Sequence, residues 1–511
     1  MNFTMSANEK ELRESRKAER NERRTAAAAE QEKKSRRYRR NVVIVVVVLI
    51  VLIVGALLIN SNFFYTKTTA MTVGTTKYTP AEVSYFNRST YNGIYSNIVS
   101  QLGSYASMLL DTSKPLSEQA YPYDETGEKT WADAIAESAE NDIIRITAFA
   151  DAATAAGRTL SEEDEATVAQ AVETYKEYAA SNGFTDVNKF LAAYFGKGVD
   201  ENTVTKLQRR ILLANNYMTE IHDGFTYTGD ELAAYYSEHA DELDYYDYYA
   251  YTLYGSMPQF DDVAEDQKEA KVHEAAETII AAATDAESYI AAVKEFAGED
   301  TSVNVMASHA DAISINYSEW ITDPARQPGD TTVLDVNGNS YALFFIGRDN
   351  NDYNTVDYRH ILVKAEADEN GAYTEEALFA ARTKAEDIFA QWRQDPTEEH
   401  FISLVGDASD DAGSNTNGGL YEQVTKYRMV PGVNAFLFDE GHVAGDAGVV
   451  LGKSDTYTGY HVMYYVGDNA RNCDLLAENE MREADYNAKT EEITAGYSVV
   501  KGSGMRFVSE L

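Results

Sequence analysis

Two of the eight histidines in the chain lie in similar surroundings, each within a short apolar segment that is typical of a β-strand. His360 lies in DYRHILVKAE, and His461 lies in GYHVMYYVGD. Side chains alternate between the faces of a strand, so His360 shares a face with Leu362, and His461 shares one with Met463. If the two strands are neighbours, both imidazoles meet on one face, where they can donate and accept hydrogen bonds.

Other kinds of chemistry leave weaker patterns. His400, His442 and the many acidic residues show no metal-ligand spacing, although a surface Ca²⁺ site stays open as an alternative. Gly418 and Gly419 are not followed by the Gly-Lys-Ser/Thr of a phosphate-binding loop. Cys473 is the only cysteine, which excludes an internal disulfide. A single histidine is more often structural than catalytic. The hypothesis of a functional site therefore rests on His360 and His461 occurring together.

The size and charge of the chain limit its function. At 511 residues and 56.7 kDa it is too long for one core, and we expect three or four domains. Hydrophobic residues make up 44%, enough to bury several cores. The chain has 44 Lys and Arg against 83 Asp and Glu, a net charge of −39. Such a surface repels phosphate groups, which excludes nucleic acid as a partner.

The N-terminal part differs from the rest. Residues 1–40 hold 13 Lys and Arg against 7 Asp and Glu, and Val42 to Ile59 follow as 18 residues without a charge. A bilayer-spanning helix needs about 20 apolar residues, and basic residues favour the cytoplasmic side. We therefore predict a cytoplasmic tail over 1–40, one transmembrane helix over 41–60 and an extracytoplasmic remainder. A cleaved signal peptide is the alternative, but its apolar region is usually about 7 to 15 residues long.

Residues 66–243 show the three- and four-residue spacing of amphipathic helices. Val204 and Leu207 begin one apolar stripe, while Ser161 and Gly183 are a cap and a stop of another helix. Near DYYDYYAYTLYG the pattern changes to aromatic, β-prone residues. This change predicts the end of an all-α region.

An internal repeat follows the helical region. The segments WITDPARQPGDTTV and FLFDEGHVAGDAGV align without a gap, with an aromatic residue, Asp and Gly-Asp at identical offsets. Each precedes an aromatic strand that ends in Gly and, after one residue or none, Asp-Asn. Upstream, DYYAYTLY corresponds to DYRHILVK. We predict two copies of one α+β unit, residues 245–350 and 354–469.

The first copy lacks both histidines. Ala250 takes the place of His360, and either Tyr341 or Ala342 takes the place of His461. A histidine needed only to fill a core has no reason to be paired, yet both are absent together. The comparison favours a functional role for the pair in the second copy.

Within the second copy, a coarse reading gives the elements that must position the histidines. It predicts a strand over 356–365, a helix from Glu375 to Gln391, a short helix around His400 to Leu404, a glycine-rich loop and two final strands. The long helix has a regular apolar stripe, which we expect to pack on the sheet.

Four motifs of the second copy resemble the parvulin peptidyl-prolyl isomerases: RHILVK, SDDAGSNTNGGL, RMVPGVNAFLFD and TGYHVMYYVG, in that order. The closest likeness is to the membrane-attached, PrsA-like foldases of Gram-positive bacteria. The helical region resembles a SurA-type chaperone segment. The implied fold class is α+β, with a single transmembrane helix, an all-α chaperone region and two parvulin-like units of which the first is degenerate. Residues 470–511 form a helical and strand extension.

The resemblance also assigns roles to residues. It implies that His360, Asp411 and His461 are catalytic, whereas Asp411 taken alone is typical of a loop-capping residue. Where the family has a phenylalanine four residues after the methionine, this chain has Val433. The substrate-binding positions that the resemblance implies are Leu420, Met429, Val433, Phe438 and Thr458.

The implied function is isomerisation of X-Pro bonds in unfolded or partly folded exported polypeptides, at the cell membrane. Such a site needs no nucleophile, metal or cofactor. The alternative is a holdase chaperone or scaffold with vestigial isomerase activity, and a structural surface protein is a third possibility. Oligomeric state, client identity and the residue preferred before proline leave no pattern in the sequence.

Overall fold

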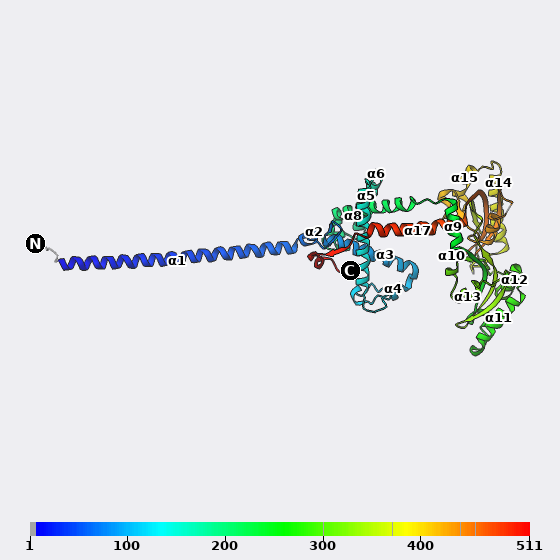
Figure 1. Cartoon of the computed structure of the whole chain (residues 1–511), viewed down its shortest axis with the longest axis horizontal. Helices are drawn as coiled ribbons and strands as arrows, with labels where there is room; N and C mark the ends of the chain where they lie inside the picture. Colours follow the sequence, from blue (N-terminus) through cyan, green and yellow to red (C-terminus); the bar gives the residue numbers. More distant parts are fainter. Residues whose placement is uncertain (1–6, 300, 370, 440, 455) are drawn as a thin grey trace. The chain divides into compact units, whose positions relative to one another are not determined.

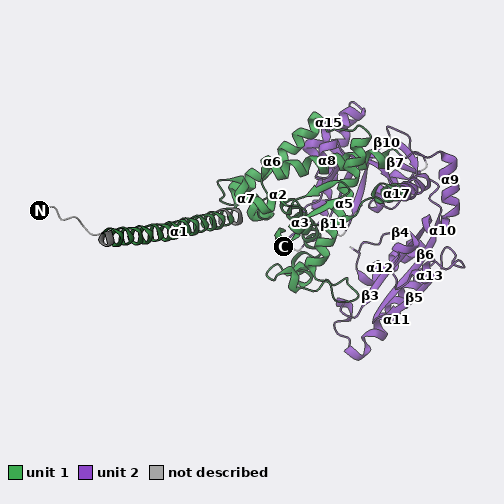
Figure 2. Cartoon of the chain, turned by 60° about the vertical axis from the view of Figure 1, so that its left-hand side comes forward, with its two compact units in different colours: residues 1–224, 486–511 green, residues 225–485 purple. Residues whose placement is uncertain are grey.

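The computed structural model describes residues 7–299, 301–369, 371–439, 441–454 and 456–511, without the side chains of 7–9, 54, 56 and 58–60. The chain forms two compact units. Unit 1 comprises Met1–Gly224 and Tyr486–Leu511, and unit 2 comprises Phe225–Asp485; Figure 2 colours them green and purple.

The first helix, α1, spans Ala7–Asn60 and is the long blue helix in Figure 1. Among the residues that the structure describes, no helix is both long and apolar enough to cross a membrane. The transmembrane helix predicted over 41–60 is therefore not found. Positions 54, 56 and 58–60 of the prediction lie outside the described side chains.

Unit 1 is mainly helical, and its helices start where the sequence supplies caps. Thr79, Thr130 and Ser161 each accept a hydrogen bond from the backbone three residues on, and an acidic side chain there bonds back. These reciprocal caps satisfy donors that a helix start leaves free. The helices that follow α1 are α2 (Phe63–Lys67), α3 (Pro80–Leu102), α4 (Ala106–Leu109), α5 (Trp131–Ala155), α6 (Glu162–Ser181), α7 (Val187–Tyr194) and α8 (Glu201–Asp223).

The C-terminal segment completes unit 1. Helix α17 (Asn472–Thr494) contains the boundary between the units, and β11 (Val499–Lys501) follows it. β11 pairs antiparallel with β1 (Met71–Val73), which pairs with β2 (Thr76–Tyr78). The small sheet of unit 1 thus joins residues near both ends of the chain.

Unit 2 begins with α9 (Gly229–Glu238) and α10 (Ala240–Leu243) and then forms two four-stranded antiparallel sheets. We call the part around the first sheet the first module (residues 245–349) and the part around the second sheet the second module (residues 354–471). The first module contains β3 (Tyr245–Tyr254), α11 (Lys268–Ala282), α12 (Ala286–Ala297), β4 (Met306–Ser308), α13 (Ser318–Ile321), β5 (Thr331–Val336) and β6 (Asn339–Asp349). The second contains β7 (Asn354–Lys364), α14 (Glu375–Trp392), α15 (Glu398–Ala408), β8 (Leu420–Val424), α16 (Pro431–Leu437), β9 (Ala447–Lys453) and β10 (Thr458–Arg471).

The two sheets have the same strand order, β4-β3-β6-β5 and β8-β7-β10-β9. Their central pairs also share a register: His461 lies opposite Leu362, and Tyr341 lies opposite Thr252. Because Ala250 corresponds to His360, the equivalent of His461 is Tyr341 rather than Ala342. Tyr341 accepts a hydrogen bond from the Asn316 side chain at 2.7 Å.

The sheet of the second module separates two apolar layers. Ile361, Val363 and Val462 point to the layer that contains α14 and α15. Tyr358 and Met463 point to the opposite layer, which contains α16. This alternation follows from the two-residue period of a strand. The histidines share the parity of Tyr358 and Met463, so they lie on the α16 side.

Candidate active site

The two histidines meet as the strand periodicity predicts. β7 and β10 are neighbours, with His360 opposite Met463 and His461 opposite Leu362. The two Nδ1 atoms lie 2.9 Å apart, and the ring centroids are 5.1 Å apart with the planes inclined by 20°. Both side chains are buried, His360 at 5% and His461 at 3% exposure. The imidazoles therefore form one hydrogen-bonded unit shielded from water.

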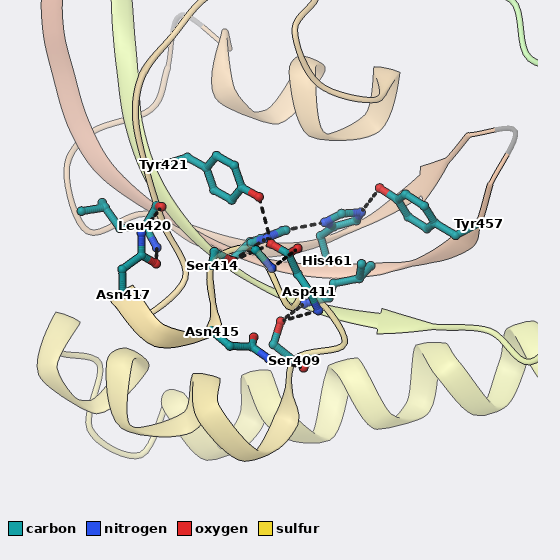
Figure 3. Close-up of polar contacts among 12 residues, drawn as sticks. Ser409, Asp411, Ser414, Asn415, Asn417, Leu420, Tyr421, Tyr457 and His461 are labelled. Atoms are coloured by element: carbon teal, nitrogen blue, oxygen red, sulfur yellow. Dashed lines mark hydrogen bonds and ion pairs between the residues drawn. The ribbon is translucent and has the colours of Figure 1, made fainter. Parts of the chain in front are cut away.

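Asp411 reaches this pair from the loop that follows α15. Its Oδ2 atom lies 2.8 Å from His360 Nε2 and accepts hydrogen bonds from the Ser414 and Tyr421 hydroxyls, at 2.5 and 2.9 Å. Figure 3 shows these contacts around Asp411. The hydrogen bond from His360, followed by those of the hydroxyls, holds the pKa of Asp411 well below its usual range. The carboxylate is therefore ionised at neutral pH.

An ionised carboxylate can only accept hydrogen bonds, which fixes the tautomers of a neutral pair. His360 must carry its proton on Nε2, so its Nδ1 accepts, and His461 must donate from Nδ1. His461 Nε2 is then an acceptor, and the Tyr457 hydroxyl lies 3.1 Å from it as the donor. All hydrogen bonds run in one direction, from Tyr457 through both imidazoles to Asp411.

Burial keeps His461 uncharged. Burial, and after it the neighbouring His360, lower the pKa of His461 to about 3, against the opposing effect of Asp411. A neutral His461 is the form that can accept from Tyr457 while donating to His360. Charge and tautomer thus agree with the geometry.

A cavity of about 390 Å³ opens over these residues. Of the eight site residues predicted from the sequence, the structure places five in its lining: His360, Asp411, His461, Met429 and Val433. The remaining lining residues are Tyr358, Leu362, Lys364, Tyr421, Arg428, Val430, Thr456 and Tyr457. His360, Asp411 and His461, here called the triad, form one side of the cavity, and the other walls combine aliphatic and aromatic side chains with the polar Lys364, Arg428 and Thr456. Apolar walls with a few polar groups are the usual composition of a ligand site.

Comparison with known families matches residues 341–466 to the PPIC-type PPIASE domain. The match begins in β6 and covers nearly all of the second module. The chain contains a peptidyl-prolyl cis-trans isomerase domain of the parvulin type. The histidines, Asp411 and the cavity all lie within the matched residues of this isomerase domain.

Two solved structures are similar over much of their length. PrsA from Bacillus subtilis is 14% identical, with a TM-score of 0.18, over 58% of this chain and 86% of that one. The peptidylprolyl isomerase PrsA from Bacillus cereus is 15% identical, with a TM-score of 0.17, over 60% and 90%. TM-scores this low carry no argument about the arrangement of the chain. No curated protein matches the chain.

Three substrate-binding positions predicted from the sequence do not line the cavity of the isomerase domain. Leu420 begins β8, and its backbone is hydrogen-bonded to the Asn417 side chain, as Figure 3 shows. Phe438 directly follows α16 and contacts the Tyr353 ring edge-on at 5.8 Å between centroids. Thr458 is buried, and its carbonyl accepts a hydrogen bond from the amide of Ala365.

Sequence reasoning missed several residues of the isomerase site, among them four that carry hydroxyl groups: Tyr358, Ser414, Tyr421 and Tyr457. Tyr358 shares the face of His360, because it lies two residues before it in the same strand. Three hydroxyl groups donate hydrogen bonds to the triad. Those of Ser414 and Tyr457 come from loops, and that of Tyr421 comes from the second residue of the short strand β8. No periodicity marks such positions, although Tyr421 follows directly after the Gly-Gly-Leu motif.

The Gly-Gly turn is needed for a close approach of backbones. Gly419 has a φ of +73°, and a Cβ atom there would lie 2.4 Å from the carbonyl oxygen of His360. The carbonyl of Gly419 accepts a hydrogen bond from the amide of His360 at 3.0 Å. A glycine at this position therefore allows the Asp411 loop to lie against β7.

Gly452 in β9 leaves room for the second imidazole. A Cβ atom there would lie 2.3 Å from His461 Nε2 and 2.6 Å from its Cδ2. We expect Gly452→Ala to displace the ring from Tyr457 and His360 and to lower kcat/KM by about tenfold, the effect of losing about 1.4 kcal/mol. A proline-peptide isomerisation assay measures this. Gly406→Ala is the control, since a Cβ there meets nothing within 4 Å; equal activity of both variants would contradict the prediction.

The described side chains of the isomerase site interact through hydrogen bonds and apolar contacts. Within the described ranges, no group of three or more His, Cys, Asp or Glu side chains could hold a metal ion. Cys473, in α17, lies outside the cavity lining. What the site offers is an apolar enclosure and a fixed set of hydrogen bonds.

Proposed function

We propose that this isomerase assists the folding of exported proteins from an anchored position at the outer face of the cell membrane, with His360, Asp411 and His461 as its catalytic residues. The observation that carries the proposal is the hydrogen-bonded chain of these three residues beside an apolar cavity.

Rotation about an X-Pro bond must break the resonance of the amide, a barrier of about 18 to 20 kcal/mol. The twisted amide carries less charge on its oxygen and nitrogen than the planar one. Apolar walls such as Met429 and Val433 exclude water that would favour the planar form. The ring nitrogens of the two imidazoles are already engaged with each other, Asp411 and Tyr457, so the pair offers the peptide a rigid surface to pack against rather than a hydrogen-bond partner.

The proposed clients are unfolded or partly folded exported polypeptides. Proline isomerisation takes tens to hundreds of seconds unaided and can limit folding. The test is refolding of an exported protein whose slow phase is set by proline. We expect the full chain to speed this phase and His461→Phe to abolish the effect. If both proteins improve the yield equally without changing the rate, the chain acts as a holdase instead.

The proposed anchor rests on the sequence of residues 1–60. The apolar side chains from Val42 to Ile53 are all exposed in α1, and the preceding 40 residues are basic. An isolated helix that is apolar all round needs a membrane or another apolar partner.

For the anchor, we expect the full chain to remain with the membrane fraction after a high-pH wash. The double variant Val47→Lys and Ile50→Lys should be released, because each central lysine costs about 2.5 to 3.5 kcal/mol on insertion. Protease added outside intact cells should digest unit 2 and spare residues 1–40. Val500→Lys, at an exposed position of β11, is the control for expression. Release of the unaltered chain by the wash would contradict the anchor.

A further inference from the structure

A second cavity, of about 360 Å³, lies between the two modules of unit 2. The first module contributes Tyr249 of β3, Ile290 of α12 and residues 303–305. The second module contributes residues 427–431 and Asn434 of α16. Its volume is within the range of sites that bind small ligands or single side chains.

This cavity adjoins the active site. Arg428, Met429 and Val430 line both the second cavity and the cavity over the histidines. These three residues belong to the loop between β8 and α16. A polypeptide whose proline occupies the active site can therefore reach the second cavity by crossing this loop.

The lining of the second cavity is suited to an apolar side chain. Val303 and Val305 are half-buried and pack against the core of the first module, and Tyr249 is buried beside them. Asn304 and Arg428 are exposed at its margin. The floor is thus apolar, while polar groups lie where a peptide backbone would enter.

The neighbouring backbone is suited to an extended chain. Residues 301–305 have no regular secondary structure and lead directly into β4, which is the edge strand of the first sheet. Edge strands carry backbone groups that pair readily with an added extended peptide. An extended client segment beside residues 303–305 would place alternate side chains toward the cavity.

We propose that the second cavity is a subsite for a bulky aliphatic or aromatic side chain of the same extended client chain whose proline is bound over His360 and His461. The inference rests on the proposed function and deepens it. The first module, which has Ala250 and Tyr341 in place of the histidines, then contributes to catalysis by binding the client rather than by isomerising it. Clients with an apolar residue close to proline are preferred.

The test compares two peptides of about twelve residues, each extending to about 40 Å, with one central Ala-Pro bond. One carries leucines on both sides of this core, and the other carries serines. With the full chain, we expect kcat/KM to be about tenfold higher for the leucine peptide, the gain from burying roughly one large side chain. Asn304→Trp, which fills the cavity from its margin, and Val303→Asp, which puts a charge in it, should remove this advantage and leave the serine peptide unchanged.

The matched control is Ile315→Asp, because Ile315 is 92% exposed in the same module and lies outside the cavity lining. It should keep the leucine preference. Asn304→Trp decides the question if Val303→Asp does not fold. A leucine preference that survives Asn304→Trp, or its absence in the unaltered chain, would overturn the subsite. Lack of turnover of the serine peptide would instead refute the proposed catalytic site, and anisotropy of a labelled leucine peptide would still test the subsite.

Discussion

Asp411→Ala is expected to lower kcat/KM for a proline peptide by about 100-fold. The substitution removes the acceptor of three hydrogen bonds, from His360, Ser414 and Tyr421. It leaves a buried imidazole donor unpaired, which costs about 1 to 3 kcal/mol, and frees the tautomer of the pair. Asp411→Asn keeps the shape and one acceptor oxygen, so its loss should be about tenfold. A protease-coupled or NMR exchange assay measures both.

The control for this experiment is Asp407→Ala, at an exposed position of α15 outside the cavity lining. Its activity should equal that of the unaltered chain. Thermal unfolding of each variant separates a catalytic loss from a folding loss. An Asp411→Ala variant that is folded and fully active would show that the carboxylate does not set the rate.

Asp247→Asn is expected to stabilise unit 2 at pH 8 and to have little effect at pH 4. Asp247 is buried in β3, at 7% exposure, and burial raises its pKa to about 7. This value includes a smaller raising effect of Asp349 and an opposing effect of Lys426. Lys426 forms an ion pair with Asp349 at 3.5 Å, so its charge is shared between the two carboxylates.

The raised pKa of Asp247 determines how the free energy of unfolding changes with pH. Below pH 3.8, the usual value, Asp247 is protonated in both the folded and the unfolded chain. As pH rises toward 7, the unfolded chain releases the proton and the folded chain keeps it, so the free energy of unfolding falls. Asparagine does not titrate, so the free energy of unfolding of the Asp247→Asn variant does not fall in this way. We expect it to raise the free energy of unfolding by about 2 to 4 kcal/mol at pH 8.

Denaturant unfolding at the two pH values measures this effect of Asp247. Asp311→Asn is the control, because Asp311 is exposed in the same module. It should change the free energy of unfolding by less than about 0.5 kcal/mol at either pH. A difference between Asp247→Asn and the unaltered chain that is equal at pH 4 and pH 8 would contradict the raised pKa.

Sequence periodicity predicts the central part of the site well. Strand alternation brings His360 and His461 to one face, and the apolar stripe of α14 predicts a helix that the structure places at Glu375–Trp392. Both predictions rest on side chains whose burial follows directly from a regular repeat.

Irregular segments explain what the sequence does not predict. β8 has only five residues, and one of them, Gln423, has a φ of +51°, so no alternation marks it. Ser414 and Tyr457 reach the triad through loops, where hydrogen bonds depend on the path of the backbone rather than on spacing. Helix α16 is short, and Pro431 at its start was the sole local signal for it.

The pairing of β11 with β1 has a consequence for how the chain is made. Met71 pairs with Lys501, and the whole of unit 2 lies between them in the sequence. During synthesis, all of unit 2 leaves the ribosome before the last strand of the unit 1 sheet exists. The isomerase module can therefore fold first, while the helical unit 1 stays incomplete until β11 has left the ribosome. Before β11 has been made, the chain can therefore contain a folded isomerase module together with an incompletely folded unit 1.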